Sequence, residues 1–110
     1  MPKEIPALDP ELLADIIRRV VRVAHPVRIV LFGSSARGQR RPDSDVDLLV
    51  VVRPRVHRGH LAERIYQSFI GLEVPVDVIV ATEDDIERHR SNPGLIYQTI
   101  LEEGTAVYGS

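Results

Sequence analysis

The fold is decided by residues 27–52, which read VRIVLFGSSARGQRRPDSDVDLLVVV. This stretch holds two apolar runs, residues 27–32 and 46–52, in which Val, Ile and Leu predominate. β-Branched residues favour strands, and unbroken apolar runs are typical of strands that are covered on both faces of a sheet. The short connection between the runs, residues 33–45, predicts that the two strands are antiparallel neighbours.

A third apolar run, residues 74–81 (VPVDVIVA), follows a segment with helical periodicity. In that segment Leu61, Ile65 and Phe69 recur every fourth residue, which predicts a helix over residues 60–70. A helix between two strands is the usual crossover between parallel neighbours. We therefore expect the third strand to run parallel to the second.

An amphipathic helix is expected before the first strand. Asp9 and Pro10 form a typical helix start, in which an N-cap acid is followed by proline in the first turn. Pro26 should end this helix, because the residue before a proline disfavours the helical conformation. Apolar residues recur between these points with helical spacing, and the opposite side carries Arg18, Arg19 and Arg22.

Two further helices and a short strand are expected after the third strand. Thr82 and the acidic residues behind it predict a helix over residues 82–90. Residues 93–103 predict another helix, which ends at Gly104. Residues 106–108 can add an edge strand. The sequence thus predicts an α/β (α+β) fold, a small mixed β-sheet with helices packed on it.

The composition limits the possible functions. The 110 residues fit one domain, which we expect to span residues 1–110. The absence of cysteine excludes disulfides, thiol nucleophiles and thiolate metal sites. The net charge of −2 argues against binding nucleic acid by bulk electrostatics. Because the sequence has no apolar run long enough for a membrane span and no apolar signal-peptide core at its start, we expect a cytoplasmic protein.

A glycine-containing loop, GSSARG at residues 33–38, directly follows the first strand. Gly33 permits a tight turn and a close approach of the backbone to a ligand. The residues behind it can open a short helix whose N–H groups attract phosphate, with Ser34 adding a hydroxyl and Arg37 a positive charge. A plain turn with a serine cap explains the same residues. The loop is neither a Walker A loop nor a dinucleotide-binding fingerprint.

Two carboxylates mark the start of the second strand. Asp45 and Asp47 lie two residues apart, so on a strand their side chains share one face. Such like charges repel unless a cation lies between them, and divalent cations such as Mg²⁺ prefer oxygen ligands of this kind. An acidic turn is the alternative, but it explains poorly why Asp47 lies within a run of Val and Leu.

A third carboxylate, Asp77, lies inside the third apolar run. An ionised side chain in a buried strand is unfavourable unless it is paired or bound to a metal, and a salt bridge to an arginine is the alternative. If the second and third strands are neighbours, Asp77 meets the Asp45 and Asp47 pair. The antiparallel first strand brings Gly33 to the same edge. A phosphate-binding loop facing a carboxylate cluster predicts phosphoryl or nucleotidyl transfer.

The spacing of these motifs has a known counterpart. Gly33-Ser34, ten further residues and Asp45-Val46-Asp47 resemble the GSx10DxD signature of the DNA polymerase β-like nucleotidyltransferase superfamily. The flanking FGS, ARG and SDVDL segments look most like the minimal nucleotidyltransferase (MNT) family. The resemblance covers nearly the whole chain and implies the polymerase β-like nucleotidyltransferase fold.

The resemblance implies a donor substrate and a reaction. Gly33 and Ser34 would bind the β- and γ-phosphates of a nucleoside triphosphate, with Arg37 as a further phosphate contact. The reaction would transfer a nucleoside monophosphate, AMP from ATP, to an acceptor and release pyrophosphate.

The resemblance also implies a metal site. Asp45 and Asp47 would bind two Mg²⁺ ions. Asp77 would complete the site and help to remove the proton of the acceptor. The three aspartates would therefore be both the catalytic residues and the metal ligands.

The family further implies a partner. Minimal members commonly pair with a helical HEPN protein in toxin–antitoxin type systems, and some adenylylate that partner on a tyrosine. We therefore expect a HEPN-family acceptor, with no membrane and no direct nucleic-acid binding, and leave homo- or hetero-oligomers open. The alternatives are a nucleotide-binding antitoxin without catalysis and a subunit of a small-molecule (antibiotic) nucleotidyltransferase.

Overall fold

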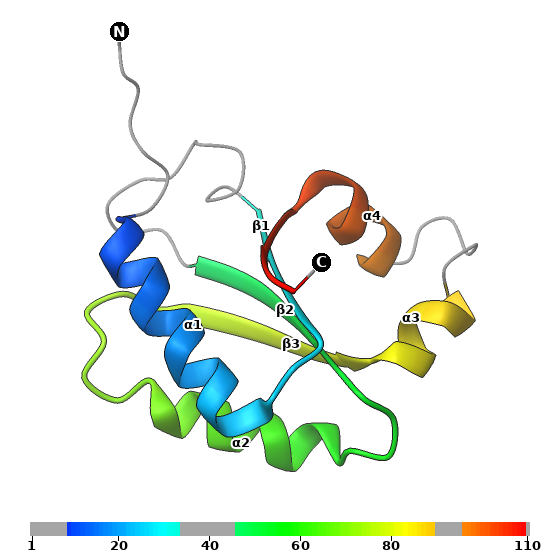
Figure 1. Cartoon of the computed structure of the whole chain (residues 1–110), viewed down its shortest axis with the longest axis horizontal. Coiled ribbons are helices and arrows are strands. Elements are labelled where there is room, and N and C mark those ends of the chain that lie inside the picture. The colour runs from blue at the N-terminus through cyan, green and yellow to red at the C-terminus, as the bar shows by residue number, and fades with distance from the viewer. Residues whose placement is uncertain (1–8, 34–45, 90–95, 110) are drawn as a thin grey trace, which may run out of the picture.

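The computed structural model describes residues 9–33, 46–89 and 96–109. Four helices and four strands follow one another along these residues (Figure 1). In chain order they are α1 (Pro10–Ala24), β1 (Arg28–Phe32), β2 (Val46–Val52), α2 (Arg58–Ser68), β3 (Val76–Thr82), α3 (Glu83–His89), α4 (Ile96–Glu103) and β4 (Thr105–Tyr108). The predicted mixed α/β class is confirmed.

The strands form one sheet in the order β3-β2-β1-β4. β1 is antiparallel to both β2 and β4, whereas β2 and β3 are parallel and joined through α2. The antiparallel pair, the parallel crossover and the C-terminal edge strand expected from the sequence are thereby confirmed. Figure 1 shows α1 and α2 together on one face of the sheet, while α3 and α4 lie on the other.

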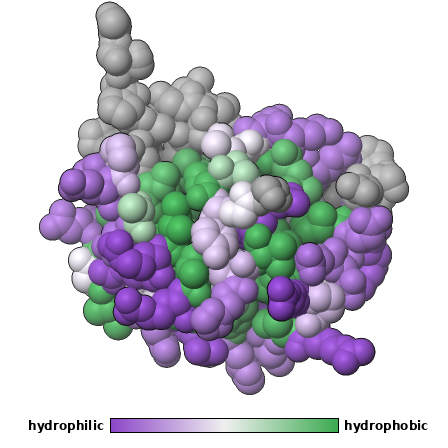
Figure 2. Space-filling model, in the orientation of Figure 1, coloured by the Kyte–Doolittle hydropathy of each residue, from purple (hydrophilic) through white to green (hydrophobic). Residues whose placement is uncertain are grey.

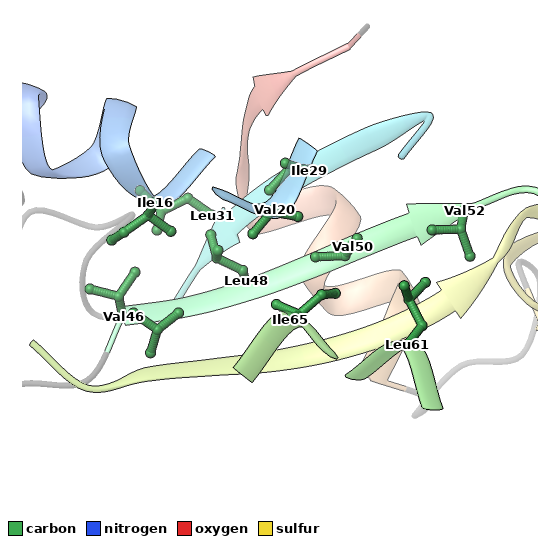
Figure 3. Close-up of a cluster of buried hydrophobic side chains, with 11 residues drawn as sticks. Ile16, Val20, Ile29, Leu31, Val46, Leu48, Val50, Val52, Leu61 and Ile65 are labelled. Carbon is green, nitrogen blue, oxygen red and sulfur yellow. The ribbon is translucent and has the colours of Figure 1, made fainter. Parts of the chain in front are cut away.

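Both faces of the two central strands are buried. Leu48 and Val50 pack with Ile16 of α1 and Ile65 of α2, as Figure 3 shows. The alternate residues of β2 face the other way, where Leu49 packs beneath Ile100 of α4. Burying each such side chain stabilises the fold by about 1.5–3 kcal/mol. This double burial is the reason why the strands read as unbroken apolar runs.

The expected ends of α1 are confirmed. The carboxylate of Asp9 accepts a hydrogen bond from the N–H of Glu11, with an N···O distance of 3.0 Å. His25 ends the helix in the left-handed conformation (φ 46°), directly before Pro26. The first helix therefore begins and ends where local sequence signals place it.

Arg19 joins α1 to the end of α2. Its Nη1 atom donates to the carbonyl oxygens of Ser68 at 2.6 Å and of Ile70 at 3.0 Å, while its Nε donates to Asp15 at 3.1 Å. A helix leaves its last carbonyls without partners, and a cation there also offsets the helix dipole. One arginine on α1 thus pairs two carbonyls at the end of α2.

Several boundaries differ from the expected ones. β3 begins at Val76 rather than at residue 74, although the Pro75 carbonyl still accepts from the N–H of Val46 at 2.9 Å. α2 begins two residues early, because the Nδ1 of His57 accepts from the N–H of His60 and caps the helix. Of the last predicted helix, residues 93–95 lie outside the described residues.

Gly104 ends α4, as expected. Its N–H donates to the Ile100 carbonyl at 2.8 Å, and its φ is not positive. A Cβ atom at this position would lie 2.6 Å from the Ile100 oxygen and 2.9 Å from the Leu31 oxygen. Glycine is therefore required here by the close approach of α4 to β1.

Candidate active site

The structure brings three of the predicted site residues to one edge of the sheet. Gly33 directly follows β1, whose last residue, Phe32, pairs with Asp47 of β2. Asp47 in turn pairs with Asp77 of β3. Adjacent strands lie about 4.8 Å apart, so paired residues are immediate neighbours. Residues far apart in the sequence thus meet where β1 ends and where β2 and β3 begin.

The two carboxylates lie on the same face of the sheet. Asp47 alternates with Val46 and Leu48, which pack with α1 and α2, so its side chain projects from the opposite face. Asp77 occupies the equivalent position between Val76 and Val78. Both aspartates therefore project from the face that carries α3 and α4. Asp77 is exposed and Asp47 is half-buried, which leaves the pair accessible to a ligand.

Gly33 fits closely against the first of these carboxylates. Its φ of +77° lies in the left-handed region, which favours glycine. A Cβ atom at Gly33 would lie only 2.5 Å from the Oδ2 atom of Asp47. The Gly33 backbone therefore lies directly against the Asp47 carboxylate, and any other residue type at position 33 would displace that carboxylate.

The chemistry of this donor set suits a divalent metal ion. Two like-charged carboxylates on neighbouring strands repel each other, and a cation relieves that repulsion. Mg²⁺ is bound in proteins by a small number of carboxylates together with substrate phosphates and water. Asp47 and Asp77 provide such oxygen ligands at an accessible edge.

Three other predicted site residues, Ser34, Arg37 and Asp45, lie outside the described residues. Within the described part of the chain, no group of three His, Cys, Asp or Glu side chains is arranged to hold a metal. Two of the three predicted ligands, Asp47 and Asp77, belong to that part. The third ligand and the phosphate-binding side chains therefore stay predictions.

Tyr66 supports the site in a way that the sequence analysis did not identify. Its hydroxyl accepts a hydrogen bond from the N–H of Val78 at 2.8 Å and approaches the Val78 carbonyl at 3.4 Å. Val78 follows Asp77 directly on an edge strand, so this contact holds the backbone that carries the carboxylate. A side chain that binds a backbone 12 residues away leaves no local pattern in the sequence.

The opposite end of β3 carries a separate polar cluster. The Oδ2 atom of Asp85 accepts from the N–H of Thr82 at 2.9 Å and from Nη1 of Arg58 at 2.7 Å, and Thr82 Oγ1 accepts from the N–H of Asp85. Burial by itself raises the pKa of Asp85. The hydrogen bonds from Thr82 and the nearby Arg58 charge outweigh burial, so the pKa lies below its ordinary value. This cluster caps α3 and ties it to α2.

In the described residues, no helix combines the length and the apolar character that crossing a membrane requires.

Comparison with known proteins agrees with the fold. The model of the nucleotidyltransferase domain family matches residues 13–107. No curated protein sequence matches the chain.

Two solved structures share the architecture. One is a candidate nucleotidyltransferase from Sulfolobus solfataricus, with a TM-score of 0.58 and 25% identity over 80% of this chain and 84% of that one. The other is a toxin–antitoxin structure with AMP-PNP, with a TM-score of 0.55 and 23% identity over 87% of this chain and 73% of that one. The second likeness concerns the fold alone. The match to the family over nearly the whole chain shows that this protein belongs to the nucleotidyltransferase domain family.

Proposed function

We propose that the chain transfers a nucleoside monophosphate, AMP from ATP, to a partner protein. The observation that carries the proposal is the register of Asp47 with Asp77, with the Gly33 backbone against the Asp47 carboxylate. Membership of the nucleotidyltransferase family supports the reaction class. The nucleotide, the acceptor and the role of each residue are part of the proposal.

The aspartates would hold the metal. Asp47 and Asp77, together with Asp45, would bind two Mg²⁺ ions. When bound, such a metal pair neutralises the charge that develops on the attacking and leaving oxygens of an in-line displacement. The carboxylates would hold these ions at the strand ends and in that way set where the α-phosphate can bind.

The loop after β1 would hold the rest of the donor nucleotide. The backbone at Gly33 approaches this edge closely because it carries no Cβ, and Ser34 and Arg37 would contact the β- and γ-phosphates. The acceptor oxygen would attack the α-phosphorus as the bond to the pyrophosphate oxygen breaks. The exposed Asp77 carboxylate would accept the proton that the acceptor hydroxyl loses.

A protein acceptor is proposed on two grounds. The motifs resemble those of minimal nucleotidyltransferases that pair with HEPN proteins, and one structure of the same fold is a toxin–antitoxin structure with AMP-PNP. We therefore propose a HEPN-family partner in a toxin–antitoxin type system, located in the cytoplasm. The single-domain organisation over residues 1–110 belongs to the same proposal.

The proposal is tested with purified chain, Mg²⁺, ATP labelled at the α-phosphate and a candidate HEPN-family partner protein. Label should appear on the partner, and Asp47→Asn and Asp77→Asn should each abolish it. The control is Asp84→Asn, which removes an exposed carboxylate on α3. If the partner binds but takes no label from the native chain, transfer to this partner is refuted.

The same experiment separates catalysis from binding. A nucleotide-binding antitoxin would neutralise its partner equally well after Asp45→Asn and Asp47→Asn. Label on an added antibiotic, with none on the protein, would instead indicate a small-molecule acceptor. The first result would refute catalysis as the basis of neutralisation, and the second would replace the proposed acceptor.

A further inference from the structure

A second surface, remote from the carboxylates, has the features of a protein-docking groove. An open hollow of about 610 Å³ lies between α1 and β4. Its lining consists of Ala14, Ile17, Arg18, Val21, Arg22 and Tyr108. Figure 2 shows apolar side chains at the surface beside α1, bounded by hydrophilic ones. We infer that this groove binds an acidic amphipathic helix of another protein.

The groove is apolar along its floor. Ile17 and Val21 are one helical turn apart and only partly buried, because Ile16 and Val20 take the positions that face the core. Tyr108, from the edge strand β4, forms the other wall with 38% of its surface exposed. Apolar residues spaced along a helix and facing an open hollow match the way amphipathic helices are bound in grooves.

The rim of the groove is positively charged. Arg18 and Arg22 lie one turn apart on α1, and both side chains are exposed. Arg18 has one carboxylate partner, Asp15, at 3.4 Å, whereas Arg22 forms no ion pair with any described residue. A ligand with carboxylates beside its apolar stripe would therefore complement this rim.

The same charges disfavour a second copy of this chain as the occupant. A symmetric pairing through the groove would bring Arg18 and Arg22 of one copy against those of the other, and such like-charge contacts are unfavourable. An added strand is also disfavoured. The edge strand β4 is only four residues long, and its register with β1 shifts between Ile29 and Val30. Short and irregular edge strands pair poorly with a further strand.

The groove and the candidate active site lie apart. Tyr108 pairs with Ile29 near the start of β1, whereas Gly33 follows the end of that strand. The groove also lies beside α1, on the face of the sheet opposite to Asp47 and Asp77. A helix bound in the groove would leave the carboxylates accessible, so binding there needs neither metal nor nucleotide.

The test is a selection from displayed 18-residue helical peptides against the native chain. The recovered peptides should carry apolar residues at positions i, i+3 or i+4 and i+7, with Asp or Glu beside them. Arg22→Glu should weaken their binding about three- to tenfold, and higher salt should weaken it further. Tyr108→Ser should weaken binding without changing its salt dependence.

Arg64→Glu, the same charge reversal on the exposed side of α2, is the matched control and should bind as the native chain does. Thermal unfolding of each variant separates loss of binding from loss of folding. The inference is overturned if no peptide is recovered, or if Arg22→Glu binds the recovered peptides as tightly as the native chain. It is also overturned if sedimentation shows a native dimer that Tyr108→Ser dissociates, because the occupant would then be a second copy.

Discussion

Replacing Gly33 by alanine tests the geometry of the candidate active site most directly. The new Cβ would lie 2.5 Å from Oδ2 of Asp47, whereas ordinary contacts begin near 3.4 Å. The carboxylate must therefore retreat by nearly 1 Å. Displacing a reacting group by about 1 Å lowers a rate about 10²-fold. Gly33→Ala should accordingly reduce nucleotidyl transfer about 100-fold and weaken Mn²⁺ binding, with Mn²⁺ serving as a spectroscopic probe of the metal site.

The same substitution strains the backbone, so its effect on stability must be separated from its effect on the site. A non-glycine residue in the left-handed region costs about 1–2 kcal/mol, and each kcal/mol lowers the Tm of a domain of this size by roughly 4–8 °C. Gly71→Ala is the matched control. Gly71 also has a positive φ, of 96°, but a Cβ there would have no atom within 4 Å.

The two variants are compared by thermal unfolding, by Mn²⁺ titration followed by electron paramagnetic resonance, and by transfer from α-labelled ATP. Both should lose a similar amount of stability. Only Gly33→Ala should lose metal affinity and activity at temperatures where both variants are folded. If Gly33→Ala retains as much activity as Gly71→Ala, the contact between Gly33 and Asp47 does not position the carboxylate, and the reasoning is refuted.

Three further substitutions test the contacts that support the fold and the site. Asp85→Asn should destabilise the chain by about 1–2 kcal/mol at neutral pH, since it weakens charge-assisted hydrogen bonds. Because the pKa of Asp85 is lowered in the folded state, its carboxylate contributes fully to stability above about pH 4, and this contribution is lost as the pH falls through the folded-state pKa. Urea unfolding should therefore show the stabilities of Asp85→Asn and the native chain converging in acid. Asp84→Asn, on the exposed side of the same helix, is the control and should change stability little at neutral pH. Tyr66→Phe should lower kcat more than it raises the KM for ATP, and it should cost less than about 1.5 kcal/mol of stability. An unchanged kcat would contradict the positioning role of Tyr66. Arg19→Met should cost about 1–3 kcal/mol of stability, and each kcal/mol lost should lower the Tm by about 4–8 °C. Hydrogen exchange at the end of α2 should become faster. A native-like exchange pattern would show that the arginine does not hold that end.

The end of the sheet that carries Asp47 and Asp77 and the groove beside α1 depend on different features of the fold. The carboxylates need β2 and β3 in one register, because a shift by one residue would turn Asp47 or Asp77 to the other face. The apolar floor of the groove needs Val20 to be buried in the core while the partly buried Val21 lines the groove. We therefore expect substitutions at the groove to affect binding and substitutions at the edge to affect chemistry.

Much of this architecture follows from local sequence alone. The unbroken apolar runs specify the strands because both of their faces are buried, and the lengths of the connections decide which neighbours are antiparallel and which are parallel. Asp9, Pro26 and Thr82 mark helix ends because capping depends on residues within one turn. The spacing of the motif residues predicted a shared edge for Gly33 and Asp47, as the structure shows.

The tertiary structure decided what depends on distant residues. The sequence predicted that Asp77 meets Asp47 only on the condition that their strands are neighbours, and packing both strands between the helix layers decides the register that pairs them. Arg19 reaches backbone atoms 49 and 51 residues away, so no periodicity could indicate that contact. The groove beside Tyr108 exists only because β4 returns to pair with β1 next to the first helix. Local signals determine the elements of this protein, and packing determines which of their side chains meet.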